Sequence, residues 1–446
     1  MAKNQTQFIC SSCGAVFSRW QGKCSQCGGW NTLSEAVFKS TKRASHFDPA
    51  SVGSLGKVEK ARSERIKTGM GEFDRVLGGG IIPDSVVLLG GDPGIGKSTL
   101  IIQVASKVAS TENVIYVSGE ESKEQVALRA ERLGINSSKL LFMAENDLET
   151  ILEGLKSIKP KLAIIDSIQT VSSGEIAGVA GNVSQVTYSS QRLIELAKTE
   201  GIALVIIGHV TKEGNFAGPK ILEHLVDVVL YLEGDRYSGF RVVRGVKNRF
   251  GSTNETGIFE MTAGGLLSVA NPSEMLLSER SSEASGTTIF PAMEGRRCLL
   301  TEVQALTTTT PFGYPRRTAS GIDLNRLQLL IAILSKRAGL NLSTQDVFVN
   351  IVGGLTIREP GIDLPTMIAV VSALKNRVVD SKTVIFGEVG LAGEVRNVNN
   401  IEERLAEAEK LGFLRAVVPK LRRFPKSRLK VVEVRSISEA ISHVLK

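Results

Sequence analysis

Gly91-Asp92-Pro93-Gly94-Ile95-Gly96-Lys97-Ser98-Thr99 is the stretch that decides the fold of this 446-residue chain. It fits the pattern G-x-x-x-x-G-K-[ST], a loop whose backbone N–H groups and following helix N-terminus surround the phosphates of a nucleotide. The apolar run 85–90 before it is expected to be a buried strand, and the run 100–109 after it a helix. All the quoted residues are therefore candidates for binding ATP. We expect Lys97 to reach the β- and γ-phosphates and the Ser98 hydroxyl to ligate Mg²⁺.

The length and composition indicate a globular protein with two or three domains. Hydrophobic residues make up 42% of the chain and charged residues 22%, which is ordinary for a soluble protein. No apolar run approaches the roughly 18–20 residues that a bilayer span needs, and the N-terminus lacks the apolar core of a signal peptide. We therefore expect a cytoplasmic protein with no membrane partner.

The net charge of +8 is concentrated at the two ends of the chain. Residues 1–65 carry ten Lys and Arg against four Asp and Glu, and residues 414–446 carry nine against two. Basic ends favour a polyanionic partner, most simply nucleic acid. A solvated surface that keeps the protein soluble is the alternative interpretation.

Two cysteine pairs, Cys10-x-x-Cys13 and Cys24-x-x-Cys27, lie in the first 34 residues. Four thiolates in pairs of this spacing complete a tetrahedral Zn²⁺ shell with no open position, which predicts a structural site. A redox dithiol is less favoured because no βαβ pattern surrounds the pairs. The only tryptophans of the chain, Trp20 and Trp30, lie in the same module. We expect them to pack over the metal-binding turns, with stacking on nucleic acid bases as the alternative.

Residues 66–270 alternate between apolar runs and helical patterns, which predicts a parallel sheet with helices on both faces. The run 162–166 ends in Asp166, a second candidate for holding Mg²⁺ at the edge of the sheet. Glu120 is our candidate for the general base of ATP hydrolysis, with Glu121 in reserve; the alternative is that they are acids at a helix start. His209 ends another strand, where it would sense the γ-phosphate or form only local hydrogen bonds.

Two Gly-rich stretches, 172–184 and 212–220, follow strands that end at the same edge of the sheet. We expect them to line a channel for a strand of nucleic acid, and ordinary surface loops are the alternative.

The motif Lys247-Asn-Arg249-Phe-Gly251 completes a set of three features, with the four-cysteine module and the phosphate-binding core. In this set the chain resembles the bacterial RadA (Sms) family of DNA-repair ATPases over essentially its whole length. The resemblance implies a RecA-like ATPase fold, hexameric rings around single-stranded DNA, and branch migration together with the recombinase RecA. It also implies that Glu120 takes the place of the catalytic carboxylate of such motors and His209 that of their sensor glutamine.

Lys247 and Arg249 follow a predicted strand, 240–246, that holds no acid to pair with them. On the resemblance to hexameric motors, we hypothesise that both cations reach the ATP site of the neighbouring subunit and stabilise charge on the γ-phosphate. Phosphate contacts within the same subunit and plain surface charge are the alternatives.

The C-terminal region, 288–446, resembles the α+β proteolytic domain of Lon and follows an expected linker, 271–287. In that family a serine and a lysine form the active site. Their positions are matched here by Asp363 in Gly361-Ile-Asp-Leu-Pro and by Glu402 in Asn400-Ile-Glu-Glu-Arg. Neither acid can serve as an activated hydroxyl or as its amine base, so we expect no peptidase activity. A ring-forming scaffold with a duplex-binding basic tail, 415–430, is the expected role.

The predicted organisation is a zinc ribbon-like module (1–34), a linker (35–65), a RecA-like P-loop ATPase core (66–270), a second linker and the Lon-like domain. The leading functional hypothesis is an ATP-driven motor on single-stranded and branched DNA. An ATP-switched accessory factor that loads or clamps RecA without translocating is the alternative. A KaiC-like signalling ATPase is a weaker hypothesis, because it leaves the zinc module and the basic ends without a purpose.

Overall fold

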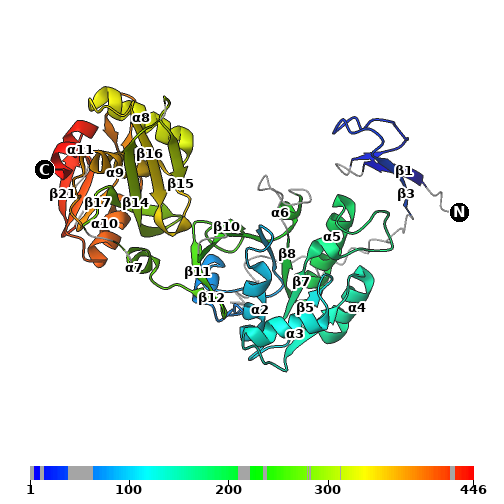
Figure 1. Cartoon of the computed structure of the whole chain (residues 1–446). Coiled ribbons are helices and arrows are strands. Elements are labelled where there is room, and N and C mark those ends of the chain that lie inside the picture. The colour runs from blue at the N-terminus through cyan, green and yellow to red at the C-terminus, as the bar shows by residue number, and fades with distance from the viewer. Residues whose placement is uncertain are drawn as a thin grey trace, which may run out of the picture. The chain divides into compact units, whose positions relative to one another are not determined.

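The computed structural model describes residues 5–10, 15–38, 64–208, 221–234, 239–278, 280, 283–311, 313–421 and 427–445 (Figure 1). The chain divides into two compact units. The first comprises Met1–Glu233, Val242–Thr253 and Met261–Ser268, and the second comprises Gly234–Arg241, Asn254–Glu260 and Val269–Lys446. Within the described ranges, no helix has the length and apolar character needed to cross a membrane.

The nine-stranded sheet has the strand order β12-β11-β10-β9-β4-β8-β7-β5-β6, and its strands from β9 to β6 belong to the first unit. The six strands from β9 to β6 in this order pair in parallel, and β10 pairs antiparallel with β9. Every residue of β4, β5, β7 and β8 is buried, as expected for strands covered on both faces. The strands are β4 (Val86–Gly91), β5 (Val114–Ser118), β6 (Leu140–Ala144), β7 (Leu162–Asp166), β8 (Ala203–Ile207), β9 (Val228–Glu233), β10 (Phe240–Asn248), β11 (Thr256–Thr262) and β12 (Gly265–Ser268).

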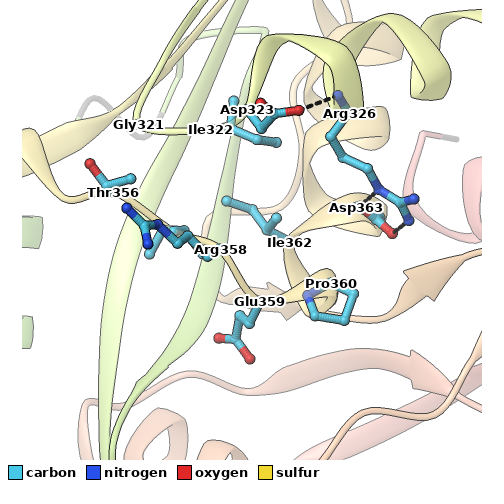
Figure 2. A pocket seen from close by; sticks show the side chains of 11 residues that line it. Gly321, Ile322, Asp323, Arg326, Thr356, Arg358, Glu359, Pro360, Ile362 and Asp363 are labelled. Carbon is cyan, nitrogen blue, oxygen red and sulfur yellow. Dashed lines mark hydrogen bonds and ion pairs between the residues drawn. The ribbon is translucent and has the colours of Figure 1, made fainter. Parts of the chain in front are cut away.

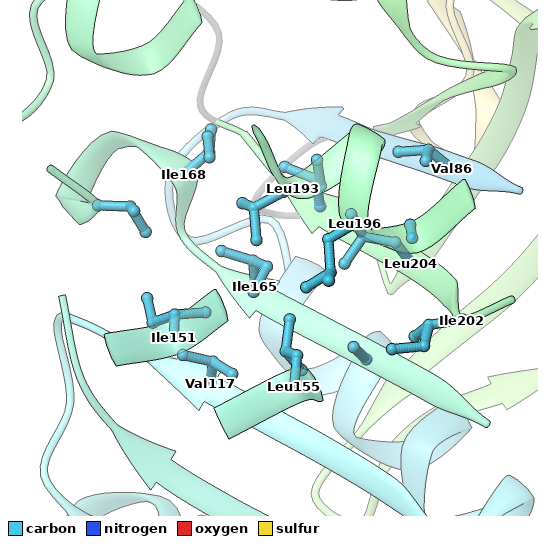
Figure 3. Close-up of a cluster of buried hydrophobic side chains, with 14 of the residues drawn as sticks. Val86, Val117, Ile151, Leu155, Ile165, Ile168, Leu193, Leu196, Ile202 and Leu204 are labelled. Atoms are coloured by element: carbon cyan, nitrogen blue, oxygen red, sulfur yellow. The ribbon is translucent and has the colours of Figure 1, made fainter. Parts of the chain in front are cut away.

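Helices cover both faces of this sheet, which confirms the predicted doubly covered α/β core. Side chains of α4 (Leu148–Ile158) and α5 (Val183–Glu200) pack on β5, β7 and β8 in one apolar cluster (Figure 3). From the other face, α2 (Lys97–Val108) packs against β5 and β7. The remaining helices of the unit are α1 (Gly71–Val76), α3 (Lys123–Arg132), the 3-10 turn η3 (Ile168–Thr170) and α6 (Ile221–Leu225).

The N-terminal module is a small antiparallel sheet in the order β2-β1-β3. Its strands are β1 (Gln5–Cys10), β2 (Val16–Phe17) and β3 (Leu33–Phe38). The core holds Cys10, Cys24 and Leu33, with Phe8, Ala15 and Phe17 packed against them. Both tryptophans lie outside this core: Trp20 is 57% exposed and Trp30 is 71% exposed. The expectation that they pack over the metal-binding turns is therefore wrong, because the phenylalanines occupy that place.

The second unit has an α+β fold around a sheet in the order β15-β16-β14-β13-β17-β20-β21. The strands are β13 (Thr287–Glu294), β14 (Arg297–Thr309), β15 (Arg317–Ser320), β16 (Gln345–Ile351), β17 (Thr383–Ile385), β20 (Arg415–Pro419) and β21 (Lys430–Val434), with the small pair β18 (Glu388–Val389) and β19 (Val395–Arg396) beside them. The helices are α7 (Pro272–Leu277), α8 (Leu324–Arg337), α9 (Asp363–Lys375), α10 (Ile401–Lys410) and α11 (Ile437–Val444). Helix α7 lies inside the expected linker 271–287 and packs on β14.

Candidate ATP site

The Gly-rich loop between β4 and α2 requires glycine for two separate reasons. Gly91 has a φ of +151°, and a Cβ there would lie 2.5 Å from the carbonyl oxygen of Leu232. Gly96, the N-cap of α2, has a φ of +113°, a backbone conformation that L side chains rarely adopt. The chain can therefore turn sharply from the buried strand into the helix, and the first N–H groups of α2 remain available to an anion.

Lys97 lies under this loop and is only 4% exposed. Its Nζ donates hydrogen bonds to the carbonyl oxygens of Gly91 at 2.8 Å and Asp92 at 2.9 Å. Burial lowers the pKa of Lys97, and the nearby carboxylates of Asp166, Asp92 and Glu120 oppose that shift. The ammonium thus lies within electrostatic reach of both acids that the sequence assigns to the site.

Asp166 ends β7, which pairs with β5 in a register that sets Ser118 opposite Asp166. The hydroxyl of Tyr116, a buried residue of β5, donates a hydrogen bond to the Asp166 carboxylate. Burial and the Asp166 charge raise the pKa of Tyr116 well above its usual range, so the phenol stays protonated and remains a donor. Sequence reasoning missed Tyr116, although a phenol within an otherwise aliphatic strand indicates a buried hydroxyl that needs a partner.

The two candidate bases differ in their surroundings. Ser167, which follows Asp166 and is fully buried, donates its hydroxyl to Glu120 Oε1 at 2.6 Å. Glu121 instead pairs with Arg129 of α3. Glu120 therefore lies on the side of Asp166 and Lys97, while Glu121 is engaged by the helix that follows it. His209 and the stretch 212–220 lie outside the described residues.

ATP with Mg²⁺ fits the groups that the structure brings together. The backbone turn at Gly91–Gly96 and the buried Lys97 can receive the phosphates, and Ser98 in the first turn of α2 can ligate the ion. Asp166 supplies a second oxygen ligand from the adjacent strand end.

Lys247 and Arg249 each have partners within their own chain. Lys247 Nζ donates to the last carbonyl oxygens around α6, those of Glu223 at 2.8 Å, His224 at 3.1 Å and Val226 at 2.7 Å. Burial, followed by the Arg249 charge, lowers the pKa of Lys247.

Arg249 pairs with Asp227 at 3.2 Å. This acid precedes β9 and so lies outside the predicted strand 240–246. The sequence interpretation looked for a partner only within that strand and therefore treated Arg249 as unpaired. Sequence reasoning missed Asp227.

The described cysteines of the N-terminal module fit a metal ion. The thiol sulfurs of Cys10, Cys24 and Cys27 all lie within 4.8 Å of one another, and those of Cys10 and Cys27 are 3.6 Å apart. Tetrahedral zinc with Zn–S bonds of about 2.3 Å requires sulfurs about 3.8 Å apart, so this spacing suits Zn²⁺. Cys13, the fourth predicted ligand, lies outside the described residues.

The second unit contains a cavity of about 550 Å³ lined by Asp363, the residue that the sequence comparison with Lon matched to its serine (Figure 2). Asp363 is fully buried there and binds the Arg326 guanidinium through both carboxylate oxygens. The lining carries neither a serine nor a lysine, so it offers no hydroxyl–amine pair for peptide hydrolysis. Glu402 is exposed, whereas Arg404 on the same helix is buried and pairs with Glu359 of the lining.

A mostly parallel sheet that presents a phosphate-binding loop beside acidic strand ends is the architecture of RecA-like ATPases. Residues 66–145 match the family model described as the KaiC ATPase. Residues 8–35 match the rubredoxin metal binding domain, and residues 325–422 match subunit ChlI of Mg-chelatase. The chain is thus a RecA-like ATPase with an N-terminal metal-binding module.

Full-length relatives define the family more closely. The DNA repair protein RadA of Bacillus subtilis (strain 168) is 47% identical, over 99% of this chain and 99% of its own. The protein of the same name from Listeria monocytogenes is 46% identical, over 100% of this chain and 99% of its own. The chain belongs to the RadA family, as its motifs predicted. Among solved structures, the RadB recombinase is 23% identical with a TM-score of 0.37, and the match covers 46% of this chain and 99% of that one.

Proposed function

We propose that this protein is a DNA-dependent ATPase that moves along single-stranded and branched DNA as a hexameric ring. In this role it promotes branch migration of intermediates that the recombinase RecA makes during DNA repair. The observation that carries the proposal is the placement of Glu120, hydrogen-bonded to Ser167, beside the Lys97 loop in a chain whose full-length relatives are named for DNA repair.

The residues divide the work of hydrolysis between them. Lys97 and the loop N–H groups bind the phosphates, while Ser98 and Asp166 hold Mg²⁺, which neutralises phosphate charge when bound. Tyr116 fixes the Asp166 carboxylate by its hydrogen bond. Glu120 orients the attacking water and accepts its proton, and the Ser167 hydroxyl keeps the Glu120 carboxylate in place.

The loop 172–182 has an exposed tip, and hydrogen bonds to α5 hold the residues that precede the tip. Gln185 of α5 is buried, and its amide nitrogen donates to the carbonyl oxygens of Ser173, Ile176 and Gly178. The tip residue Val179 is 72% exposed. Because this stretch follows Asp166 by a single 3-10 turn, a strand of DNA that contacts the tip would be coupled to the ATP site.

Strand displacement on forked DNA tests the proposal. The chain with ATP should release the displaced strand with one polarity, and Lys97→Ala should not, because the phosphate-facing cation is lost. An accessory factor that only loads RecA would hydrolyse ATP and bind the fork while releasing no strand. That outcome would overturn the motor and favour the ATP-switched alternative.

The basic ends lead to a prediction for ATPase assays as well. Single-stranded DNA should raise the ATPase rate, and log K for DNA binding should fall with log salt by about 0.7 per phosphate contact. Binding that is insensitive to salt would assign the basic ends to protein partners instead.

A further inference from the structure

The N-terminal module leaves the two largest apolar side chains of its sequence in solvent. Trp20 is 57% exposed and Trp30 is 71% exposed, although Phe8, Phe17 and Leu33 already provide the module with a core. Indole rings carry a large apolar face, and such faces are costly to leave in water unless a partner covers them. The two rings are therefore not needed for the fold and are available for contact.

Both tryptophans lie in or next to one isolated β-bridge of the module. Lys23 and Trp30 form an antiparallel bridge pair, and the N–H of Asn31 donates to the carbonyl oxygen of Gly22 at 2.8 Å. The Trp20 ring lies against Gly22, where a Cβ would approach it to 3.8 Å. The rings are thus held by adjoining residues of the same small framework.

One ring has a cation beside it, and another cation is the sequence neighbour of the other tryptophan. Lys23 Nζ lies 5.5 Å from the centroid of the Trp30 ring, and Arg19 precedes Trp20 in the chain. Residues 15–34 hold these two cations and no Asp or Glu. Protein–protein interfaces also favour tryptophan and arginine but are poor in lysine, so a lysine over the Trp30 ring in a segment without acids better suits stacked bases joined by phosphates.

We propose that Trp20 and Trp30 form a stacking platform for the unpaired bases of single-stranded nucleic acid, with Arg19 and Lys23 contacting the adjoining phosphates. Single strands fit this surface better than duplexes because only an unstacked base exposes its flat face. The platform is a second nucleic acid contact in addition to the loops at the ATPase sheet, and it does not depend on the motor function.

Intrinsic fluorescence tests the platform directly, because the chain has no tryptophan outside this module. The full-length, zinc-loaded chain is titrated with an oligothymidine of about 16 nucleotides. A matched oligonucleotide of abasic sites offers the same phosphates without bases. Oligothymidine should quench the emission, whereas the abasic strand should bind without quenching it.

Substitutions provide the second measurement. Trp20→Ala and Trp30→Ala should each weaken oligothymidine binding about fivefold or more with an unchanged salt slope, because a stacking contact is lost and the phosphate contacts remain. Trp20→Phe should restore most of the affinity. Leu128→Ala, a matched change at a side chain 67% exposed on α3, should bind as the wild type does. Zinc content confirms that each variant has folded.

Two results would overturn the proposal: saturating oligothymidine that leaves the emission unchanged, or alanine variants that keep full affinity. An emission that responds to a protein partner and not to oligothymidine would assign the surface to protein docking. If oligothymidine quenches the emission but the protein displaces no strand, the stacking platform is supported and only the proposed motor function is wrong.

Discussion

Glu120 and Glu121 are adjacent in the sequence, yet only one of them has its carboxylate beside the ATP loop. Glu120 accepts the Ser167 hydroxyl and lies within electrostatic reach of Lys97, while Glu121 is paired with Arg129. We expect Glu120→Gln to lower the ATPase rate by about 10²–10⁴, because an amide cannot accept the proton of the attacking water. ATP binding should survive, since the phosphate contacts are intact. Phosphate release and nucleotide affinity measured on the same preparation check both expectations.

The matched control is Glu121→Gln, which removes the charge of the adjacent residue and should keep most of the ATPase activity. If the two variants exchange these behaviours, Glu121 is the base and the contact between Ser167 and Glu120 is structural.

Arg404 is the largest fully buried side chain of the described residues, and we expect its loss to be costly. Its guanidinium pairs with Glu359, donates to the carbonyl oxygens of Asn399 and Pro291, and lies over the rings of two phenylalanines. Arg404→Ala leaves Glu359 without its partner inside the fold. Because the Glu359 side chain is 22% exposed and water can reach it, the free energy of unfolding should fall by about 2–4 kcal/mol, somewhat less than when a fully buried ion pair is broken.

Calorimetric unfolding of the full chain measures this effect. Glu402→Ala, two residues earlier on the same helix and exposed, should change the free energy of unfolding by no more than about 0.5 kcal/mol. Equal unfolding temperatures for Arg404→Ala and the wild type would show that the pair contributes nothing.

At the scale of single elements, the cysteine-bearing turns of the N-terminal module should hold one zinc ion per chain. Cys24→Ser should lose that ion, because a hydroxyl is a far weaker zinc ligand than a thiolate. Cys298→Ala is the control: burial raises the pKa of the Cys298 thiol, so this thiol stays protonated and does not ligate metal. Metal analysis of protein purified without chelator checks both variants. A ratio near zero in the wild type would contradict the zinc assignment.

The sequence predicts local elements well and their partners poorly. The strand–loop–helix around Lys97 and the strand ending in Asp166 are where the pattern places them, because burial and helical period are local signals. Tyr116 could not be found in this way, because it reaches Asp166 only through the pairing of β5 with β7. No single segment of the sequence predicts the order of strands in a sheet.

Two further differences have similar causes. Asp227 pairs with Arg249 from the bend that precedes β9, which the composition of the predicted strand 240–246 does not reveal. The exposed tryptophans were expected in a core because a small module needs aromatic side chains, but Phe8 and Phe17 meet that need. Competition among residues for one core can be judged only once the fold is known.

At the scale of the whole molecule, the ring hypothesis assigns different tasks to the two cations of the Lys247–Gly251 motif. Lys247 is held by three carbonyl oxygens at the end of α6 and suits an anchor. The Arg249 side chain is 53% exposed, and its bond to Asp227 is a partly exposed ion pair. Although the Asp227 carboxylate is buried, it keeps the Val86 N–H and Lys198 when Arg249 leaves, so Arg249 can exchange Asp227 for a phosphate. We therefore expect Arg249 to be the residue that reaches the neighbouring ATP site.

Arg249→Ala should then bind ATP and hydrolyse it about 10³–10⁵ times more slowly, the range for loss of a cation supplied by a neighbour. The control is Lys198→Ala: Lys198 contacts the same Asp227 carboxylate at 3.6 Å from α5, and its loss should leave hydrolysis intact. If both variants are equally slow, the common cause is the loss of one of the two cations on Asp227, which also accepts the N–H of Val86 in β4.

Mixing two inactive proteins gives the sharpest test of this arrangement. An Arg249→Ala subunit keeps a complete phosphate-binding loop, and a Lys97→Ala subunit keeps its arginine. In an equal mixture, roughly a quarter of the subunit junctions should combine an intact phosphate-binding loop with an intact Arg249 from the neighbour. DNA-stimulated hydrolysis should therefore return to about a quarter of the wild-type rate. Because neither protein is active alone, recovered activity can come only from junctions between them. If mixed rings demonstrably form and stay inactive on DNA, Arg249 acts within its own subunit and its assignment to the neighbouring ATP site is wrong.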